Sequence, residues 1–232
     1  MFRRHLTEII PGENGFRWRG AEITRLEGFS DAVFAFAVTL LVVSLEVPKG
    51  FRELIETMRG FGPFAICFAI LANIWFQHTR FFRRYGLQTS WATFLNCVLL
   101  FFVLFYVYPL KFLFRLILEG SLLNIDDVRR LFVIYGAGYT AVFLVLALLY
   151  LHAWRLRERL GLDPSERVKT FRSLIDHVAM SIIGLTSVGL ALSLPARLIG
   201  VAGYFYFAIP IYFTIVGRIL QKRERALIAS GN

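Results

Sequence analysis

The apolar residues of this chain are gathered in long continuous blocks, and this feature constrains its fold more than any other. A bilayer core about 30 Å thick accommodates a helix of about 20 apolar residues. Continuous blocks favour such helices over strands, in which apolar and polar residues alternate. Of the 232 residues 57% are hydrophobic, above the roughly 45–50% that is typical of soluble domains. We therefore expect an all-α, polytopic membrane protein.

Six candidate membrane-spanning helices can be recognised along the sequence. Their approximate limits are residues 25–47, 61–82, 88–114, 131–154, 173–198 and 200–220. This division leaves a cytosolic N-terminal arm (residues 1–23), a six-helix transmembrane domain (residues 24–220) and a cytosolic basic tail (residues 221–232). Before the fifth span, residues 162–167 (LDPSER) predict the capped start of a cytosolic helix that leads into that span.

The distribution of Lys and Arg predicts that both termini face the cytosol. Cytosolic connections of membrane proteins are enriched in these residues. Of the 26 in the chain, 18 lie in the arm, in the second and fourth connections and in the tail, all on one side of the predicted membrane. This bias accounts for the net charge of +10 without nucleic acid as a partner, since no nucleic-acid-binding motif is recognisable. We expect a multi-pass protein of the cell membrane, in contact with lipid.

Sequence motifs for catalysis and metal binding are absent. No P-loop, GxSxG or HExxH sequence occurs, which argues against an enzyme. Cys67 and Cys97 both lie inside apolar blocks, so buried structural thiols are favoured over a disulfide or a metal site. No second His or Cys stands at ligand spacing from His78, which argues against a metal there. We expect neither a cofactor nor a bound metal.

The first block, RLEGFSDAVFAFAVTLLVVSLEVP (residues 25–48), is unusually short. Between Asp31 and Glu46 it has 14 residues without a charge, or about 21 Å of helix. If this helix spans the membrane, the polar residues at its start lie at membrane depth. At about 100° per residue its bulky apolar side chains share one face, interrupted by a hydroxyl, while Asp31 lies about 140° away from Phe36. The members of this face are Phe29, Ala32, Phe36, Thr39, Leu40, Val43 and Val47.

Asp31 needs a partner if it lies inside the membrane. An unpaired charge there costs about 2.5–3.5 kcal/mol on insertion scales. Either Asp31 is an acid favoured by the dipole at the N-terminus of the helix, or it belongs to a hydrogen-bonded network that holds this helix to its neighbours. The second block ends on the same side and supplies candidate partners, namely Asn73, Trp75, His78 and Arg80. If there is no such network, His78 is a packing residue and Trp75 is a residue of the membrane interface.

Two motifs resemble the signature of a known family. Arg25-x-x-x-Phe29-Ser30-Asp31 and Trp75-x-x-His78-x-Arg80-Phe81 are similar to the two motifs of the transmembrane protein 175 family of potassium channels. The resemblance implies a single-repeat, prokaryotic form of six helices that assembles as a homotetramer in the plasma membrane. It also implies that the first helix lines a central pore without a carbonyl filter, and that side chains build the constriction. The implied constriction residues are Phe36, Thr39 or Leu40, and Val43.

Three functions remain open at this point. The resemblance implies a passive, potassium-selective leak channel with a hydrophobic gate, whose only small ligand is the permeating potassium ion. The alternative is a proton-coupled transporter in which Asp31 and His78 relay protons, and a third is a membrane scaffold in which the apolar face of the first helix serves only packing. Transporters place polar groups near the midplane, whereas the ionisable residues here gather at the cytosolic end. That placement favours the channel.

Overall fold

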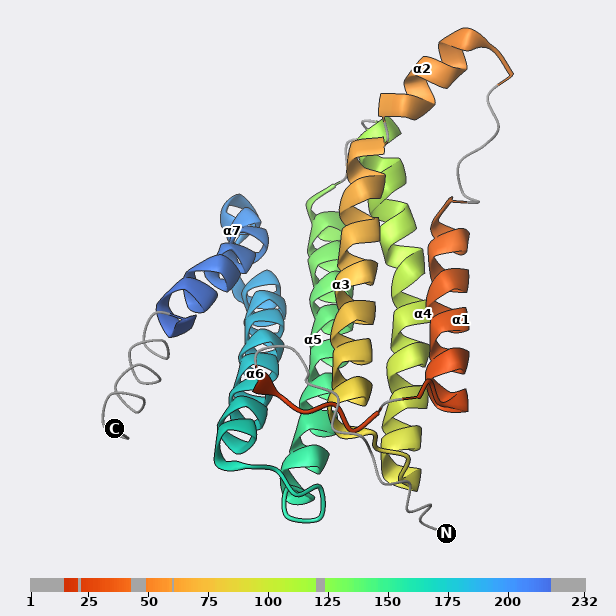
Figure 1. The fold of residues 1–232 in the computed structure, drawn as a ribbon. Helices are drawn as coiled ribbons and strands as arrows, with labels where there is room; N and C mark the ends of the chain where they lie inside the picture. Colours follow the sequence, from red (N-terminus) through yellow and green to blue (C-terminus); the bar gives the residue numbers. More distant parts are fainter. Residues whose placement is uncertain (1–14, 21, 43–48, 60, 120–123, 218–232) are drawn as a thin grey trace. The chain divides into compact units, whose positions relative to one another are not determined.

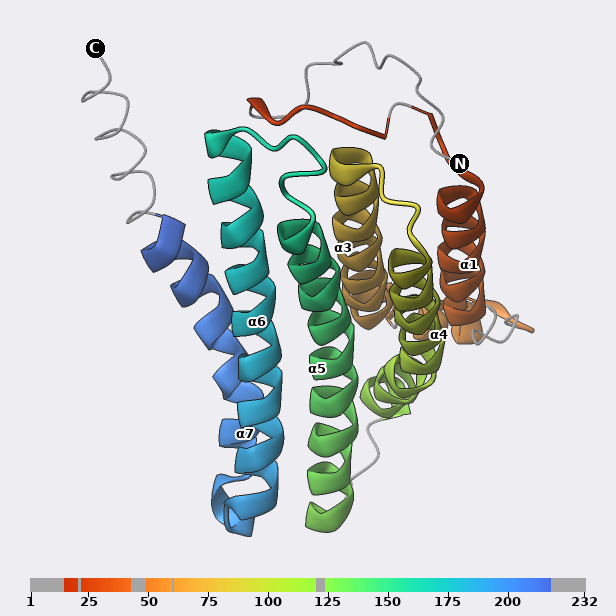
Figure 2. The ribbon, with the colours of Figure 1, turned by 90° about the horizontal axis from the view of Figure 1, so that it is seen from below.

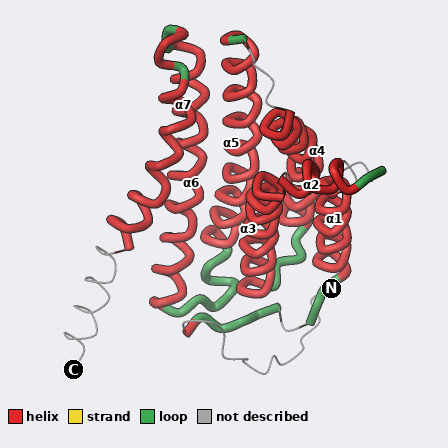
Figure 3. Tube along the Cα trace, turned by 90° about the horizontal axis from the view of Figure 1, so that it is seen from above, coloured by secondary structure: helices red, strands yellow, loops and turns green. Residues whose placement is uncertain are grey.

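The computed structural model of the chain describes residues 15–20, 22–42, 49–59, 61–119 and 124–217. The regular structure in these ranges is helical (Figures 1 and 3). The longer helices are α1 (Arg25–Val42), α2 (Phe51–Arg59), α3 (Phe61–Tyr85), α4 (Ser90–Glu119), α5 (Ile125–Arg155) and α6 (Pro164–Ser193). They are followed by η2 (Ala196–Leu198), α7 (Gly200–Tyr204) and η3 (Phe205–Phe207), after which residues 208–217 continue as a helix.

The chain divides into two compact units, residues 1–122 with 141–178 and residues 123–140 with 179–232. In the first unit α1 packs against α3 and α4, and these helices lie side by side in two views (Figures 1 and 2). Apolar side chains buried on these three helices include Phe34, Ala37, Leu41, Leu71 and Leu99. One face of α1 is thereby committed to intramolecular packing, and the described residues of the first unit leave the opposite face uncovered.

The second unit is held together by close approach of small residues. A Cβ atom built on Gly184 would lie 2.5 Å from the hydroxyl oxygen of Thr140, and one built on Gly136 would lie 2.6 Å from Cγ2 of Val188. Only glycine permits α5 and α6 to approach this closely. The Ser187 hydroxyl donates to the carbonyl oxygen of Ala202 at 2.8 Å and ties α6 to α7.

The predicted spans have helical counterparts whose ends are shifted. The fifth helix ends at Ser193 instead of residue 198, because Pro195 disfavours helical backbone at the residue before it. The capped helix start predicted at residues 162–167 is confirmed. The helix α6 begins at Pro164, the Glu166 amide donates to Asp163 Oδ1 at 2.8 Å, and the Asp163 amide donates to Glu166 Oε2 at 3.1 Å. The first helix is described as far as Val42, so the predicted residues 43–47 lie outside the described part.

Four of the described segments are long and apolar enough to cross a membrane. They are Ser90–Pro109, Ile125–Arg155, Pro164–Ser193 and Ala196–Gly217. The helix α1 is short and carries three charged residues in its first two turns, Arg25, Glu27 and Asp31, and α3 is likewise not among the four. A multi-pass membrane protein is therefore supported, whereas the count of six crossings and the cytosolic position of both termini stay predictions.

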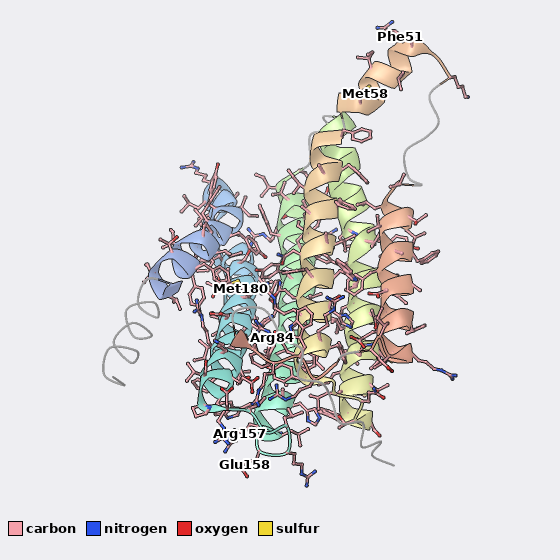
Figure 4. The ribbon with its side chains drawn as sticks, viewed as in Figure 1. Phe51, Met58, Arg84, Arg157, Glu158 and Met180 are labelled. Atoms are coloured by element: carbon pink, nitrogen blue, oxygen red, sulfur yellow. The ribbon has the colours of Figure 1, made fainter. Side chains whose placement is uncertain are left out.

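The nine-residue helix α2 is an addition to the sequence interpretation, which assigned no element between the first two spans. Its exposed apolar side chains are Phe51, Leu54, Ile55 and Met58. This spacing of i, i+3, i+4 and i+7 makes one apolar stripe, and Figure 4 labels Phe51 and Met58 along it. A short helix of this kind is typical of a membrane interface.

Candidate functional site

The uncovered face of α1 coincides with the face that the sequence predicts. Phe29 is 57% exposed and Phe36 is 56% exposed. Thr39 is also exposed, and the buried side chains of α1 all lie on the other side of the helix. Leu40 is half-buried, and Val43 lies outside the described residues. The exposed Phe36 ring and Thr39 hydroxyl therefore form a surface that is available to another subunit, to lipid or to a permeating ion.

The Thr39 hydroxyl is oriented by its own helix. It donates to the carbonyl oxygen of Ala35 at 2.9 Å, the usual arrangement for a threonine within a helix. Because the hydrogen is engaged by the backbone, the lone pairs of the oxygen remain on the uncovered side. This hydroxyl therefore offers an oxygen ligand of the kind that hard cations take.

Asp31 accepts a hydrogen bond from the indole of Trp75. The distance from Trp75 Nε1 to Asp31 Oδ1 is 2.7 Å, which is short, as expected for a donor to a carboxylate. This bond connects the second turn of α1 to α3 across 44 positions of sequence. The structure thus brings together two members of the predicted network, one from each motif.

His78 takes part in a separate buried chain. Its Nε2 lies 2.7 Å from Asn96 Oδ1, the Asn96 amide donates to Ser30 Oγ at 2.9 Å, and the Ser30 hydroxyl donates to the Leu26 carbonyl at 2.8 Å. Because the Asn96 oxygen is the acceptor in this arrangement, Nε2 of His78 carries the hydrogen. The chain joins α3 through α4 to α1, and it directs His78 to Asn96 rather than to Asp31.

Asn96 is a residue that the sequence interpretation missed. It is fully buried, as are His78 and Ser30 to within 1%. The sequence feature that could have indicated it is a single amide side chain within the apolar block of α4, since polar groups at membrane depth are costly and usually paired. Arg25, the first residue of the same signature motif, is exposed at the start of α1.

A capping box starts α1. The Thr24 amide and hydroxyl donate to Glu27 Oε2 at 3.0 and 2.8 Å, and the Glu27 amide donates to the Thr24 hydroxyl at 3.2 Å. Reciprocal bonds of this type satisfy amide groups that a helix N-terminus leaves without partners. The carboxylate of Glu27 thereby lies at the positive end of the helix dipole, and α1 has a fixed first turn.

The segment that precedes α1, residues 15–20, is bound to the rest of the first unit; we call it the N-terminal strap. The amides of Arg19 and Gly20 both donate to the Arg83 carbonyl, at 3.1 and 3.0 Å. Gly86 follows α3 with a φ of +57°, and a Cβ there would lie 2.8 Å from the Arg19 carbonyl oxygen. Phe16 is fully buried and meets Tyr85 edge to face at 5.6 Å.

Two arginines of the strap bind one buried carboxylate. The side chain of Glu166 is fully buried and pairs with Nη2 of Arg19 at 2.6 Å and with Nη2 of Arg17 at 3.1 Å. The hydrogen bond and the charge of Glu166 raise the pKa of the Arg17 guanidinium above its usual value. The first turn of α6, the end of α3 and the approach to α1 are thus joined by one short segment.

Comparison with known proteins identifies the family. A family model described as "Endosomal/lysosomal potassium channel TMEM175" matches residues 25–106, which include both motifs. A protein named "Potassium channel" from Marivirga tractuosa is 39% identical over 244 residues, covering 97% of this chain and 99% of the relative. The chain belongs to the TMEM175 family. The predicted resemblance is therefore confirmed.

Other TMEM175 proteins support the assignment. A potassium channel from Streptomyces collinus is 26% identical over 179 residues, covering 73% of this chain and 82% of the relative. The crystal structure of the potassium channel MtTMEM175, a threonine-to-alanine variant in complex with a nanobody fusion, superimposes with a TM-score of 0.81 at 37% identity, covering 92% of this chain and 100% of that one. A TMEM175 homologue from Chamaesiphon minutus, at 23% identity and a TM-score of 0.50 with 80% and 96% covered, shares the fold.

Proposed function

We propose that this chain forms a passive, potassium-selective channel in the cell membrane, with the uncovered face of α1 lining a central pore. The observation that supports the proposal is the exposure of Phe36 and Thr39 on a helix whose opposite face is buried. Membership in a family whose relatives are named potassium channels supports the choice of ion. Six helices cross the membrane in this proposal, both termini are cytosolic, and no cofactor is needed.

One α1 helix cannot enclose a pore, so the proposal requires a closed ring of subunits. Identical chains around a single rotation axis would present the same face to the centre, and we propose a tetramer. The exposed Phe36, followed by Leu40 and Val43, would form apolar layers in that ring. Narrow apolar constrictions exclude water and hence ions until they widen. The pore would therefore be gated by a hydrophobic constriction rather than by backbone carbonyls.

Thr39 supplies the polar layer of this proposed pore. Its hydroxyl hydrogen is engaged by the Ala35 carbonyl, so its oxygen can replace a water molecule that a permeating cation loses. Potassium sheds water at a lower cost than sodium because its charge density is lower. A single layer of hydroxyls binds a cation weakly enough for it to leave, and selectivity should be modest compared with stacked carbonyl rings.

The two hydrogen-bonded connections would hold the cytosolic half of α1. The bond from Trp75 to Asp31 and the chain from His78 through Asn96 to Ser30 both attach within its first two turns. The residues proposed to line the constriction lie beyond these attachments. In this arrangement α1 can tilt about a fixed base, and a change of tilt would widen or narrow the layers of Phe36 and Thr39.

Flux through liposomes tests the proposal. Purified protein reconstituted without a proton gradient should carry potassium faster than sodium, and Thr39→Val should alter the ratio. Thr186→Val is the matched control, because the Thr186 hydroxyl is also exposed and also donates to the carbonyl four residues before it, at 2.8 Å. Imaging of the assembly should show α1 at the centre of a four-fold ring.

Three outcomes would refute parts of this proposal. If flux appears only when a proton gradient is imposed, a proton-coupled transporter that uses Asp31 and His78 replaces the channel. If Thr39→Val and Thr186→Val give the same ion preference as the natural protein, α1 does not line the pathway. If Phe36→Ala changes conductance no more than Phe101→Ala, a substitution of another exposed ring, on α4, Phe36 is not at the constriction.

A further inference from the structure

A small basic pocket lies at the end of α3, apart from the uncovered face of α1. The cavity has a volume of about 50 Å³, and its lining residues are Trp18, Phe76, Thr79, Arg80, Arg83 and Arg84. The three arginines are spaced i, i+3 and i+4, so they share one side of the helix. The strap contributes Trp18 as a wall from a distant part of the sequence. None of the described lining residues is acidic.

Aromatic rings pack against all three of these arginines. The guanidinium carbon of Arg80 lies 4.5 Å from the centroid of the Phe76 ring, and that of Arg83 lies 5.4 Å from the Trp18 ring. Arg84 is held in the same way over Phe16 at 4.9 Å; Figure 4 labels Arg84 in this region. An ordered guanidinium loses less entropy when it binds an anion, and its rigid fork of donors matches the oxygens of a phosphate.

Thr79 provides a second, independent indication of a ligand. Five other helical threonines donate to the carbonyl four residues before them: Thr39, Thr140, Thr170, Thr186 and Thr214. The Thr79 hydroxyl oxygen is buried, yet within the described residues it has no hydrogen-bond partner. Buried hydroxyls are rarely left so. Thr79 is among the residues that line the same cavity as the arginines, and we take its hydroxyl as a donor to the occupant.

We propose that this pocket binds a phosphoryl group. Arginines near the end of a helix also satisfy the helix dipole and the excess of positive charge on the cytosolic side, but neither effect accounts for the cavity or for the Thr79 hydroxyl. A cavity of this size holds a few water molecules or one small tetrahedral anion. The phosphate comes from one of two sources, a phospholipid headgroup, which basic pockets on the cytosolic side of membrane proteins bind, or a soluble phosphate compound.

A binding assay on the full-length protein in a neutral detergent tests this site. Thermal unfolding is followed at constant ionic strength, set with chloride, during titration with inorganic phosphate, with dihexanoyl phosphatidylglycerol or with dihexanoyl phosphatidylcholine. We expect a phosphate-bearing anion to raise the melting temperature, and Arg83→Gln to weaken the apparent affinity roughly ten-fold. Arg159→Gln is the matched control, since Arg159 is exposed outside the pocket and the variant loses the same charge.

The two sources give different patterns of response. Stabilisation by inorganic phosphate assigns a soluble ligand, whereas stabilisation by phosphatidylglycerol but not by phosphate or phosphatidylcholine assigns a lipid headgroup. The proposal is overturned if no anion stabilises the protein more than chloride does, or if both arginine variants respond alike. If Arg83→Gln does not fold, Thr79→Val and Thr79→Ser decide, because only the serine variant retains the donor and should retain the affinity.

Discussion

The substitution Glu166→Gln should destabilise the first unit strongly, although it changes only one atom. Each carboxylate oxygen accepts from three donors: Oε1 from the Arg17 amide, Arg17 Nε and Arg19 Nη1, and Oε2 from Arg17 Nη2, Arg19 Nη2 and the Asp163 amide. Whichever way the glutamine turns, its NH₂ group faces three donors and accepts from none of them. The new amide therefore cannot replace the carboxylate.

The size of the effect follows from burial. Glu166 is fully buried, and the side chains of Arg19 and Arg17 are 18% and 38% exposed. A hydrogen bond to a charged group contributes about 1.5–3 kcal/mol, and the more exposed Arg17 contributes little after solvent screening. Loss of the Arg19 pair together with one misdirected buried amide gives about 2–4 kcal/mol. For a chain of this length that corresponds to a fall in melting temperature of roughly 4–16 °C.

Thermal unfolding in detergent, followed by size-exclusion chromatography, measures this fall. Glu158→Gln is the matched control: Figure 4 labels Glu158 with Arg157 in the turn between α5 and α6, its side chain is 78% exposed, and the pair is 3.9 Å apart. Exposed pairs of this kind contribute at most about 1 kcal/mol. Equal melting temperatures for the two variants would show that the strap is not held by Glu166.

Two further substitutions test the attachments of the helices. Trp75→Phe removes the indole donor to the Asp31 carboxylate and should lower stability by about 1–2 kcal/mol, together with a change in channel activity. Trp91→Phe, at a ring that is 50% exposed, is the control and should have little effect; equal losses of stability would contradict the hydrogen bond. Gly184→Ala places a Cβ 2.5 Å from a hydroxyl oxygen and should cost about 1–3 kcal/mol in unfolding assays, while Gly189→Ala, whose Cβ meets nothing within 4 Å, should be neutral or slightly stabilising.

The uncovered face of α1 was predictable because a helix repeats at about 100° per residue. That rule alone placed Phe29, Phe36 and Thr39 together and Asp31 on a different side. The contact between Asp31 and Trp75 was also predictable, since the two helix ends share one side of the predicted membrane and an acid at membrane depth needs a hydrogen-bond donor. Both inferences depend on local periodicity and on the cost of burying charge, which the sequence states directly.

The remaining contacts could not be predicted because they depend on pairing across the chain. Asn96 was one amide within an apolar block, and nothing local indicates that it lies between His78 and Ser30. The arginines of the strap meet Glu166 from 147 and 149 positions away, so their partner is known only once α3 and α6 are placed. The helix α2 is a different case. Its stripe of apolar residues was visible in the sequence, but it was too short to predict a helix.

The buried chain from His78 has a polarity that bears on what else can move through this protein. Each hydrogen in it is donated in one direction, from imidazole to amide to hydroxyl, and the last acceptor is the main-chain carbonyl of Leu26. A Grotthuss wire must be able to reverse all its bonds, but a peptide carbonyl has no hydrogen to return. This path is therefore a dead end for hopping protons, and it offers them no continuous route from His78 through α1.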